Sequence, residues 1–555
     1  MNTPNLYLAI KNLSVSFRTD MGVKKVLHDV SFDVYKGQTT AIVGESGSGK
    51  SVSSLSIMQL LKAGNVIFDG GEFFLKENKI LPGDKVLRAL RGDKIAMIFQ
   101  EPMTSLNPVM RVGEQVAETL RLHRQLNTKQ ARARVLELFK EVKLPRPEEM
   151  LDQYTHQLSG GQRQRVMIAM AIANEPELLI ADEPTTALDV TVQKSILDLL
   201  KELQQRYNMS MIFITHDLGV VKEIAHHIVV MQQGRVIEKG IANDILNQPK
   251  EVYTKGLMAC RPVPGKKIAR LLTIEDFTNQ NAPQIEEIKS SSVFEKELIR
   301  VEHITKRYTS YKGFFKKEKK EVLAVNDVSF TIYEGEALGL VGESGCGKTT
   351  LSRILLGLIP ASEGSIIYKG NDLTKMSAIE WKKWRKELQI IFQDPYSALN
   401  PKHSIRQILT EPMLHHRIRS NEKDAVIRAK ELLEKVGMTA EALDKYPHEF
   451  SGGQRQRIVI ARALSVEPRF IICDESVAAL DVSVQAQVLN LLTDLKREFG
   501  LTYLFISHDL SVVYQMCDRI MVMNRGRIEE LNTAENVFHH SQSEYTRSLL
   551  RSIPR

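Results

Sequence analysis

Residues 44–51 read Gly44-Glu45-Ser46-Gly47-Ser48-Gly49-Lys50-Ser51, and the rest of the chain is arranged around them. They fit the pattern G-x-x-x-x-G-K-[ST], whose glycines let successive backbone N–H groups converge on phosphate oxygens without Cβ clashes. The helix expected to start near Gly49 directs its N-terminal partial positive charge at the same anion. The pattern predicts that Lys50 reaches the β- and γ-phosphates of a nucleotide and that the Ser51 hydroxyl holds Mg²⁺.

A second copy of this phosphate loop makes a chance match untenable. It reads Gly342-Glu343-Ser344-Gly345-Cys346-Gly347-Lys348-Thr349. One accidental match in a chain of this length has a probability of roughly a few per cent. Both copies follow an apolar run, at residues 40–43 and 338–341, which indicates the buried strand that the motif requires. The chain therefore carries two predicted phosphate loops.

Other short motifs also occur twice and in the same order, so the chain is a tandem repeat. The repeat predicts two similar domains, at residues 1–262 and 298–555. Residues 263–297 contain several Pro, Asn and Ser residues and show no persistent apolar periodicity, so we interpret them as a linker. A chain of 555 residues is too long for one hydrophobic core, which agrees with this division.

Each half predicts an α/β fold with a helical subdomain. Short strands at residues 9–10 and 30–34 indicate an antiparallel β part at the start of the first half. Residues 112–157 are expected to be mostly helical, because apolar residues recur there at three- and four-residue spacing. The continuous apolar runs 178–181 and 211–214 favour parallel strands that are covered on both faces.

Composition excludes several classes of protein. No run of 18 apolar residues predicts a transmembrane helix, and the N-terminus lacks the basic and apolar segments of a secretory signal. The four cysteines show no CxxC spacing, which argues against a disulfide framework or a metal cluster and fits a reducing cytosol. The net charge of +8 fits a nucleic-acid partner, an anionic membrane surface, or simply a mildly basic cytosolic protein.

Two adjacent acids end an apolar strand in each half, as Asp182-Glu183 and Asp474-Glu475. In enzymes that carry a phosphate loop, the first acid reaches Mg²⁺ and an adjacent glutamate can act as general base for the attacking water. Two acids at the end of a buried strand are costly unless a metal or hydrogen bonds compensate. Solvated acids would explain one copy, but two copies at similar positions after their phosphate loops favour the catalytic interpretation.

A third motif reads Ser159-Gly160-Gly161-Gln162 in the first half and Ser451-Gly452-Gly453-Gln454 in the second. Both copies continue with Arg-Gln-Arg and a helical pattern. Ser-Gly-Gly at the start of a helix forms a second anion-binding terminus. A helix N-cap would be the simpler interpretation of a single copy, but the repeat at matching spacing favours the anion site.

This set of motifs resembles that of the ATP-binding cassette (ABC) ATPases, and the resemblance covers both halves nearly from end to end. It implies ATP and Mg²⁺ as cofactors, with both phosphate loops and both Ser-Gly-Gly-Gln motifs binding nucleotide. The implied catalytic residues are two general bases, two γ-phosphate-sensing histidines and two glutamines that also contact a membrane partner: Glu183, Glu475, His216, His508, Gln100 and Gln393. The implied metal-binding residues are Ser51, Gln100, Asp182, Thr349, Gln393 and Asp474.

The resemblance also implies how the two halves cooperate. Cassettes of this family meet head to tail, so Ser159 should complete the site built on Lys348, and Ser451 the site built on Lys50. Two cassettes in one chain make this dimer intramolecular, and the linker raises the effective concentration of the partner. We expect two hydrolytically competent sites, although Ser476 replaces the proline that follows the glutamate in the first half.

Four further positions match the family. Residues 187–189 and 479–481 resemble its dimer-contact loop. Phe17 and Tyr308 fall where the family stacks an aromatic ring on adenine. An aromatic residue at a strand end is more often part of the core, so a core position is the alternative interpretation of both residues.

Neighbouring segments indicate one branch of the family. Residues 99–108 and 392–401, and the tails 252–257 and 544–550, resemble importers of dipeptides, oligopeptides, nickel and glutathione. The resemblance implies ATP-driven import with two integral-membrane permease subunits and an extracytoplasmic solute-binding protein. The chain would then be a peripheral protein at the cytoplasmic face of the inner membrane. Peptides are the favoured cargo, with glutathione next and nickel third. The cysteine cluster of some members is not implied, since only Cys260 lies near its place.

The alternative is a two-cassette ATPase that acts on ribosomes or nucleic acid. Translation factors of this kind usually carry a longer, charged helical linker, whereas residues 263–297 are broken by Pro and Asn. DNA-repair relatives insert coiled coils or zinc-binding cysteines, and neither pattern occurs in this sequence. We therefore expect no nucleic-acid partner. The lysine-rich residues 312–320 fit a solvated hairpin tip or a contact with anionic lipid.

Overall fold

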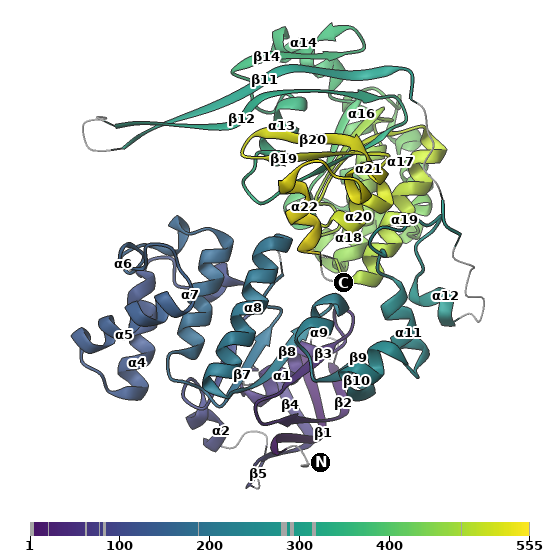
Figure 1. Cartoon of the computed structure of the whole chain (residues 1–555). Coiled ribbons are helices and arrows are strands. Elements are labelled where there is room, and N and C mark those ends of the chain that lie inside the picture. Colours follow the sequence, from purple (N-terminus) through teal and green to yellow (C-terminus); the bar gives the residue numbers. More distant parts are fainter. Residues whose placement is uncertain are drawn as a thin grey trace.

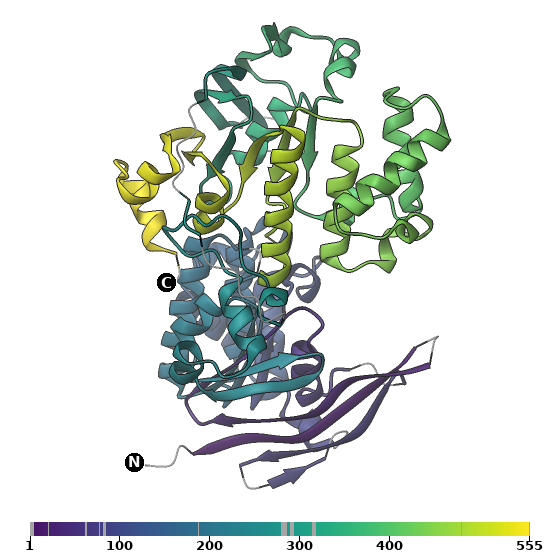
Figure 2. The same ribbon diagram turned by 90° about the vertical axis from the view of Figure 1, so that its right-hand side faces the viewer.

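A computed structural model of the chain describes residues 5–19, 22–61, 64–76, 78–81, 85–186, 188–278, 286–288, 294–312, 318–478 and 480–553. Two halves of the same architecture lie one above the other, each with two sheets and flanking helices (Figures 1 and 2). The predicted α/β fold is confirmed in both halves. Ala187 and Ala479, which belong to the expected dimer-contact loops, lie outside the described residues, as does part of the lysine-rich segment.

An antiparallel sheet opens each half. In the first half the order is β2-β1-β4-β5, made of β1 (Leu6–Thr19), β2 (Gly22–Tyr35), β4 (Val66–Leu75) and β5 (Asn78–Ile80). In the second half the order is β12-β11-β14-β15, made of β11 (Glu297–Lys312), β12 (Glu318–Tyr333), β14 (Glu363–Tyr368) and β15 (Asn371–Asp372). The expected short strands are in fact long, because β1 pairs along both edges and its register shifts let a ribbon of 14 residues bend.

A six-stranded sheet forms the centre of each half. In the first half the order is β10-β9-β3-β8-β7-β6, made of β3 (Thr39–Val43), β6 (Ile95–Ile98), β7 (Leu178–Asp182), β8 (Ser210–Thr215), β9 (His227–Gln232) and β10 (Arg235–Ile241). In the second half the order is β16-β17-β18-β13-β19-β20, made of β13 (Ala337–Val341), β16 (Leu388–Ile391), β17 (Phe470–Asp474), β18 (Thr502–Ile506), β19 (Arg519–Asn524) and β20 (Arg527–Thr533).

The central strands run parallel apart from the two outer pairs β9–β10 and β19–β20, which are antiparallel. Every residue of β7 and β8 is buried, so the prediction of parallel strands covered on both faces is confirmed. Because parallel strands bring their carboxyl ends to one edge, the phosphate loop, the acidic pair and the histidine of each half meet at that edge.

Helices between β6 and β7 form a lobe beside the central sheet, which confirms the helical stretch predicted for the first half. They are α3 (Pro102–Ser105), α4 (Val112–Arg124), α5 (Thr128–Glu141), α6 (Pro147–Met150), the 3₁₀ turn Thr155–Gln157 and α7 (Gly160–Ile172). The second half repeats the lobe, green at the right of Figure 2, with α15 (Pro395–Ala398), α16 (Ile405–His415), α17 (Glu422–Lys435), the 3₁₀ turns Ala440–Asp444 and Pro447–Glu449, and α18 (Gly452–Leu464).

The remaining helices flank the sheets. In the first half they are α1 (Lys50–Ile57), α2 (Lys85–Leu90), α8 (Val190–Tyr207), α9 (Leu218–Ile224), α10 (Ala242–Asn247) and α11 (Val252–Ala259). In the second half they are α13 (Lys348–Leu355), the 3₁₀ turn Leu373–Lys375, α14 (Ala378–Trp384), α19 (Val482–Phe499), α20 (Leu510–Met516), α21 (Ala534–His539) and α22 (Glu544–Arg551). Within the described ranges, no helix combines the length and the apolar character needed to cross a membrane.

The segment between the halves is more ordered than the linker expected from its sequence. It includes the short helix α12 (Ile274–Thr278). Ile268 and Leu271 are buried in the main hydrophobic cluster of the second half. The N–H of Leu271 donates to Oδ1 of Asn490 at 2.9 Å, and Nδ2 of Asn490 donates back to the carbonyl of Leu271 at 2.8 Å. The early part of this segment is therefore packed against α19 of the second half.

Candidate active sites

Each phosphate loop joins a central strand, β3 or β13, to the helix that follows it. The first residues of the loops, Gly44 and Gly342, have φ angles of 150° and 152°, which residues with a side chain rarely adopt. A Cβ at either position would come within 2.1 Å of a carbonyl oxygen on the neighbouring strand, that of Met231 or Met523. Both loops therefore require glycine as their first residue.

The loop lysines are buried against their own loops. Nζ of Lys50 donates to the carbonyl oxygens of Gly44 at 2.7 Å and Glu45 at 2.8 Å. Lys348 repeats both contacts in the second loop, at 2.6 and 3.0 Å. Burial lowers the pKa of the Lys50 ammonium, although the surrounding carboxylates work in the opposite direction. Each charged amine is thus held inside the curve of its loop.

The first acid of each strand end lies beside its phosphate loop. The Ser51 hydroxyl donates to Oδ1 of Asp182 at 3.2 Å. Burial raises the pKa of Asp182 to about 6, and the neighbouring Glu183 adds to this. Burial and Glu475 likewise raise the pKa of Asp474 to about 6. A buried carboxylate with a raised pKa next to a hydroxyl is a site whose charge a cation would compensate.

Oxygen ligands of this kind suit Mg²⁺, which binds few protein groups and retains water or phosphate oxygens as further ligands. In the part of the chain that the structure describes, no group of three or more His, Cys, Asp or Glu side chains could hold a metal ion. The residues present therefore fit a Mg²⁺ ion that shares its ligands with a bound nucleotide, and they do not form an all-protein metal cage.

The second acid of the first half, Glu183, is held by polar contacts with three side chains. Its backbone has a φ of 46°, in the left-handed region that non-glycine residues seldom occupy. Its carboxylate accepts from Nε2 of Gln100 at 3.0 Å and from the Thr186 hydroxyl at 2.9 Å. Nδ1 of His216 lies 3.1 Å from its other oxygen. The carboxylate is thus oriented from three sides.

These contacts shift the pKa values of Glu183 and His216. Burial alone would raise the pKa of Glu183, but the hydrogen bonds and charge of His216, the Thr186 hydroxyl and the Lys50 ammonium lower it to about 2. Burial opposes the charged form of His216, yet the Glu183 carboxylate raises the pKa of that ring. The glutamate is therefore an anion that its neighbours hold in place.

The second half repeats this arrangement with one contact missing. Glu475 has a φ of 47° and accepts from Nε2 of Gln393 at 2.7 Å. Nδ1 of His508 lies 3.7 Å from its carboxylate. Burial opposes ionisation, but His508 lowers the pKa of Glu475 below its ordinary value. Ala478 stands three residues after the glutamate, where the first half has Thr186, so this position offers no hydroxyl to the carboxylate.

The Ser-Gly-Gly-Gln motifs begin helices α7 and α18. Ser159 accepts from the N–H of Gln162, whose side chain in turn accepts from the N–H of Ser159, and Ser451 and Gln454 form the same capping box. Both serines are exposed. Over the described ranges, neither serine hydrogen-bonds to the phosphate loop of the other half. The helix-cap interpretation thus holds in this structure.

Two hydrogen bonds join the phosphate loops to the opposite halves. The N–H of Ser344 donates to Oδ2 of Asp189 at 3.4 Å, and the Ser483 hydroxyl donates to the Glu45 carboxylate. Asp189 and Ser483 lie at the starts of α8 and α19, next to the expected dimer-contact loops. Each phosphate loop therefore touches the segment that follows the catalytic acids of the other half.

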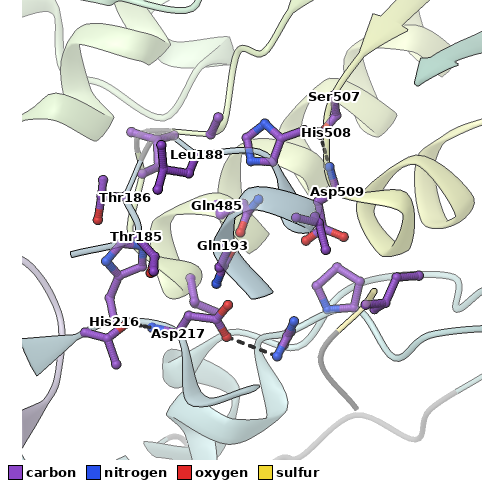
Figure 3. Close-up of a pocket in the computed structure, with 18 residues that line it drawn as sticks. Thr185, Thr186, Leu188, Gln193, His216, Asp217, Gln485, Ser507, His508 and Asp509 are labelled. Atoms are coloured by element: carbon purple, nitrogen blue, oxygen red, sulfur yellow. Dashed lines mark hydrogen bonds and ion pairs between the residues drawn. The ribbon is translucent and has the colours of Figure 1, made fainter. Parts of the chain in front are cut away.

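A cavity of about 100 Å³ lies between the halves. His216 and Asp217 line it from the first half, and His508 and Asp509 line it from the second (Figure 3). Arg261, from the tail of the first half, pairs with Asp217 at 3.0 Å on its wall. The two predicted histidines thus face one shared space.

The predicted adenine-stacking residues have different surroundings. Phe17 is half-buried and packs against the core of the first half. Tyr308 is 45% exposed, and Nζ of Lys306 lies 5.3 Å from the centre of its ring. The ring of Tyr308 is accessible to a base, whereas Phe17 also has the role of a core residue.

Several residues that contact the sites were not among those predicted, and among them Thr186, Tyr253 and Tyr545 bond to predicted residues within their own half. Thr186 escaped notice because its hydroxyl matters only through the Glu183 carboxylate. Tyr253 and Tyr545 accept hydrogen bonds from the N–H groups of Glu45 and Glu343, the second residues of the phosphate loops. The repetition of a tyrosine in both tails was the available signal, although sequence alone did not connect the tails to the loops.

Residues 27–186 and 325–478 match the family model described as ABC transporter. These two ranges make up more than half of the chain, and the chain belongs to the ABC transporter family. Residues 237–296 match a second model, described as the C-terminal region of oligopeptide/dipeptide transporters. The chain is therefore an ATPase with two cassettes, of the oligopeptide and dipeptide transporter type.

Curated relatives align over almost the whole chain. The glutathione import ATP-binding protein GsiA of Pectobacterium atrosepticum is 44% identical over 98% of this chain and 89% of its own length. The protein of the same name from Escherichia coli (strain K12) is 44% identical over 99% of this chain and 89% of its own length. Both alignments thus include the two cassettes of this chain.

Solved structures of single cassettes also align. The structure of cbiO1 from Clostridium perfringens, part of an ABC transporter complex, is 27% identical, with a TM-score of 0.39 over 45% of this chain and 93% of that chain. A dimeric cassette in a post-hydrolysis state, bound to ADP and Pi, is 27% identical, with a TM-score of 0.38 over 43% of this chain and 99% of that chain.

Proposed function

We propose that this chain supplies the energy for a bacterial importer of short peptides, with dipeptides, oligopeptides and glutathione-like tripeptides as the class of cargo. Two lines of support are the family model for oligopeptide/dipeptide transporters and the relatives named for glutathione import. The partners are two integral-membrane permease subunits and an extracytoplasmic solute-binding protein. The chain acts at the cytoplasmic face of the inner membrane as a peripheral subunit.

The observation that carries the proposal is the oriented carboxylate of Glu183, repeated at Glu475. Each glutamate lies at the end of a central strand, fixed by a glutamine and approached by a histidine. A carboxylate held in this way can orient a water molecule for in-line attack on the γ-phosphate and accept its proton. The negative charge of a bound triphosphate raises the pKa of the nearby glutamate, which makes it a stronger base when substrate is present.

Nucleotide binding falls to the two phosphate loops and their helices. Lys50 and Lys348 bond to loop carbonyls in this structure, and phosphate oxygens are better partners for an ammonium than neutral carbonyls are. Mg²⁺, when bound, neutralises charge that develops on the phosphates. Ser51, Asp182 and Gln100 would hold it in the first site, and Thr349, Asp474 and Gln393 in the second. Phe17 and Tyr308 are the candidates for stacking on adenine.

The two halves form an intramolecular dimer with two composite ATP sites. The contacts of Asp189 with Ser344 and of Ser483 with Glu45 support the head-to-tail arrangement. Ser159 then completes the site built on Lys348, and Ser451 completes the site built on Lys50. Because both serines are exposed here, ATP has to draw the halves closer, and its higher affinity for the closed state drives that movement.

The test is to purify the Glu183→Gln/Glu475→Gln chain from detergent-solubilised cells in the presence of ATP and to identify what accompanies it. Two polytopic membrane proteins that remain bound only with ATP are the expected result. Their solute-binding protein can then be screened against peptides and glutathione. Ribosomes without any membrane protein would overturn the transport proposal.

A matched control variant is Glu202→Gln/Glu498→Gln. These glutamates lie on α8 and α19 and pair with the corresponding lysines, Lys143 and Lys435, at the surface. The control removes the same charge from each half without touching either site. It should hydrolyse ATP like the parent and should not trap the complex.

A further inference from the structure

The tail of each half returns to its own phosphate loop. In the first half, α11 follows the last strands of the fold, and its Tyr253 is buried with Val43 at the end of β3. The Tyr253 hydroxyl accepts from the N–H of Glu45 at 3.3 Å and lies 3.5 Å from Oε2 of the same residue. In the second half, Tyr545 of α22 accepts from the N–H of Glu343 at 3.3 Å. The contact is thus made independently in both cassettes.

The loop residue that Tyr253 holds is also the one that the opposite half contacts. The Glu45 carboxylate accepts a hydrogen bond from the hydroxyl of Ser483, which is buried in the first turn of α19 of the second half. One carboxylate therefore connects three parts of the molecule: its own phosphate loop, the tail helix α11 and the dimer-contact region of the other cassette. The second loop differs, because Asp189 reaches the backbone of Ser344 and not a loop carboxylate.

The tail of the first half extends this connection to the second half. Leu257 of α11 packs in the same cluster as Tyr253, and Ile274 of α12 packs against that cluster and against the main core of the second half. A displacement of α11 would therefore move both the contact with Glu45 and the surface shared with the second cassette.

We propose that Tyr253 and Tyr545 are positioning residues for the two ATP sites, each setting the conformation of its phosphate loop through the loop's second residue. This inference rests on the proposed role of the loops in binding ATP. It predicts that removing only the hydroxyl weakens ATP binding, because the N–H of Glu45 or Glu343 loses its partner and the loop gains conformational freedom that nucleotide binding must then remove.

The experiment measures the affinity of a fluorescent ATP analogue for the full chain carrying Glu183→Gln/Glu475→Gln, so that hydrolysis does not interfere. Adding Tyr253→Phe/Tyr545→Phe should weaken affinity about fivefold to tenfold. The controls are Tyr207→Phe and Tyr514→Phe, which delete hydroxyls bonded to Glu141 and Glu535, away from the loops. They should lower the melting temperature to a similar extent and leave affinity unchanged.

A double-mutant cycle separates positioning from general stability. Tyr253→Phe and Ser483→Ala act on the same Glu45 carboxylate, so their effects on ATP affinity should not add. Tyr545→Phe and Ser483→Ala should add, since Tyr545 bonds to Glu343 of the second loop and Ser483 to Glu45 of the first. Affinity changes equal to those of the control variants, or additive effects in the first cycle, would overturn the proposal. Saturable ATP binding that Lys50→Ala/Lys348→Ala leaves intact would instead show that the proposed function of the loops is wrong.

Discussion

The hydroxyl of Thr186 donates a hydrogen bond of 2.9 Å to the carboxylate of Glu183, whereas the equivalent position after Glu475 is Ala478, which has no hydroxyl. The distance from Nδ1 of the histidine to the glutamate carboxylate is also shorter in the first half. It is 3.1 Å for His216 and 3.7 Å for His508. The two proposed general bases are therefore held with different numbers of contacts, although each half retains its glutamate, histidine and glutamine.

Thr186→Ala should lower turnover at the first site. In a Glu475→Gln background, where only the first site hydrolyses ATP, we expect kcat to fall about fivefold to tenfold, with little change in KM, because Thr186 contacts the base and not the loop. Ala478→Thr in a Glu183→Gln background should raise kcat. Thr119→Ala, which removes a hydroxyl bonded only to a helix carbonyl, is the control. Equal rates for Thr119→Ala and Thr186→Ala would contradict this prediction.

The double variant Glu183→Gln/Glu475→Gln should lose ATP hydrolysis at least about 100-fold, because a positioned general base contributes that much or more. Each single variant keeps one site with its glutamate, histidine and glutamine, and should retain a measurable rate of ATP hydrolysis. Phosphate release at saturating Mg²⁺ and ATP is the measurement. A double variant that keeps more than about a tenth of the parent rate would exclude these glutamates as the bases.

Asp182 makes stability depend on pH. Burial raises its pKa from 3.8 to about 6, so the folded chain holds this proton more tightly than the unfolded chain. The stabilisation that the protonated Asp182 carboxyl gives the folded chain is full below about pH 4 and is lost as the pH rises through about 6. Its loss lowers the free energy of unfolding by about 3 kcal/mol.

Asp182→Asn removes this titration, so its free energy of unfolding should fall less than that of the parent between pH 4 and pH 7. Chemical denaturation without Mg²⁺ at several pH values measures the difference. Asp198→Asn, at an exposed position of α8, should follow the parent. Parallel curves for the parent and Asp182→Asn would contradict the prediction.

Asn490→Ala should release the segment that joins the halves. It removes both hydrogen bonds with the backbone of Leu271 and leaves two buried polar groups unpaired, which costs about 1–3 kcal/mol for each group. We expect protease cleavage within residues 263–278 to become roughly tenfold faster. Thr493→Ala, three residues further along α19, removes a hydroxyl bonded to the carbonyl of Leu489 and the sulfur of Met516, not to the joining segment, and is the control. Cleavage at equal rates in the two variants would show that Asn490 does not hold the segment.

The sequence was sufficient for the features that depend on neighbouring residues. Phosphate loops, strands ending in acids and the helical lobes each follow from short local patterns, and they lie where those patterns predict. The acidic pairs and histidines come together because parallel strands share one edge, which the strand order implies.

Contacts between distant parts of the chain could not be predicted in this way. Tyr253 and Glu45 lie on different elements, and the partner of Ser483 belongs to the other half, so no spacing in the sequence relates them. The order in the segment between the halves could not be predicted for another reason. Ile268 and Leu271 are too few to give a periodic pattern, yet both are buried in the hydrophobic cluster of the second half.

The burial of Ile268 and Leu271 also decides where the polypeptide can be divided. A second cassette produced from residue 298 onward would expose the apolar surface that these side chains cover, and Asn490 would face solvent without its backbone partner. The smallest autonomous second cassette therefore begins upstream of its own first strand, near residue 266. The segment between the cassettes thus supplies part of the core of the second one, which cannot be exchanged as a module without that piece.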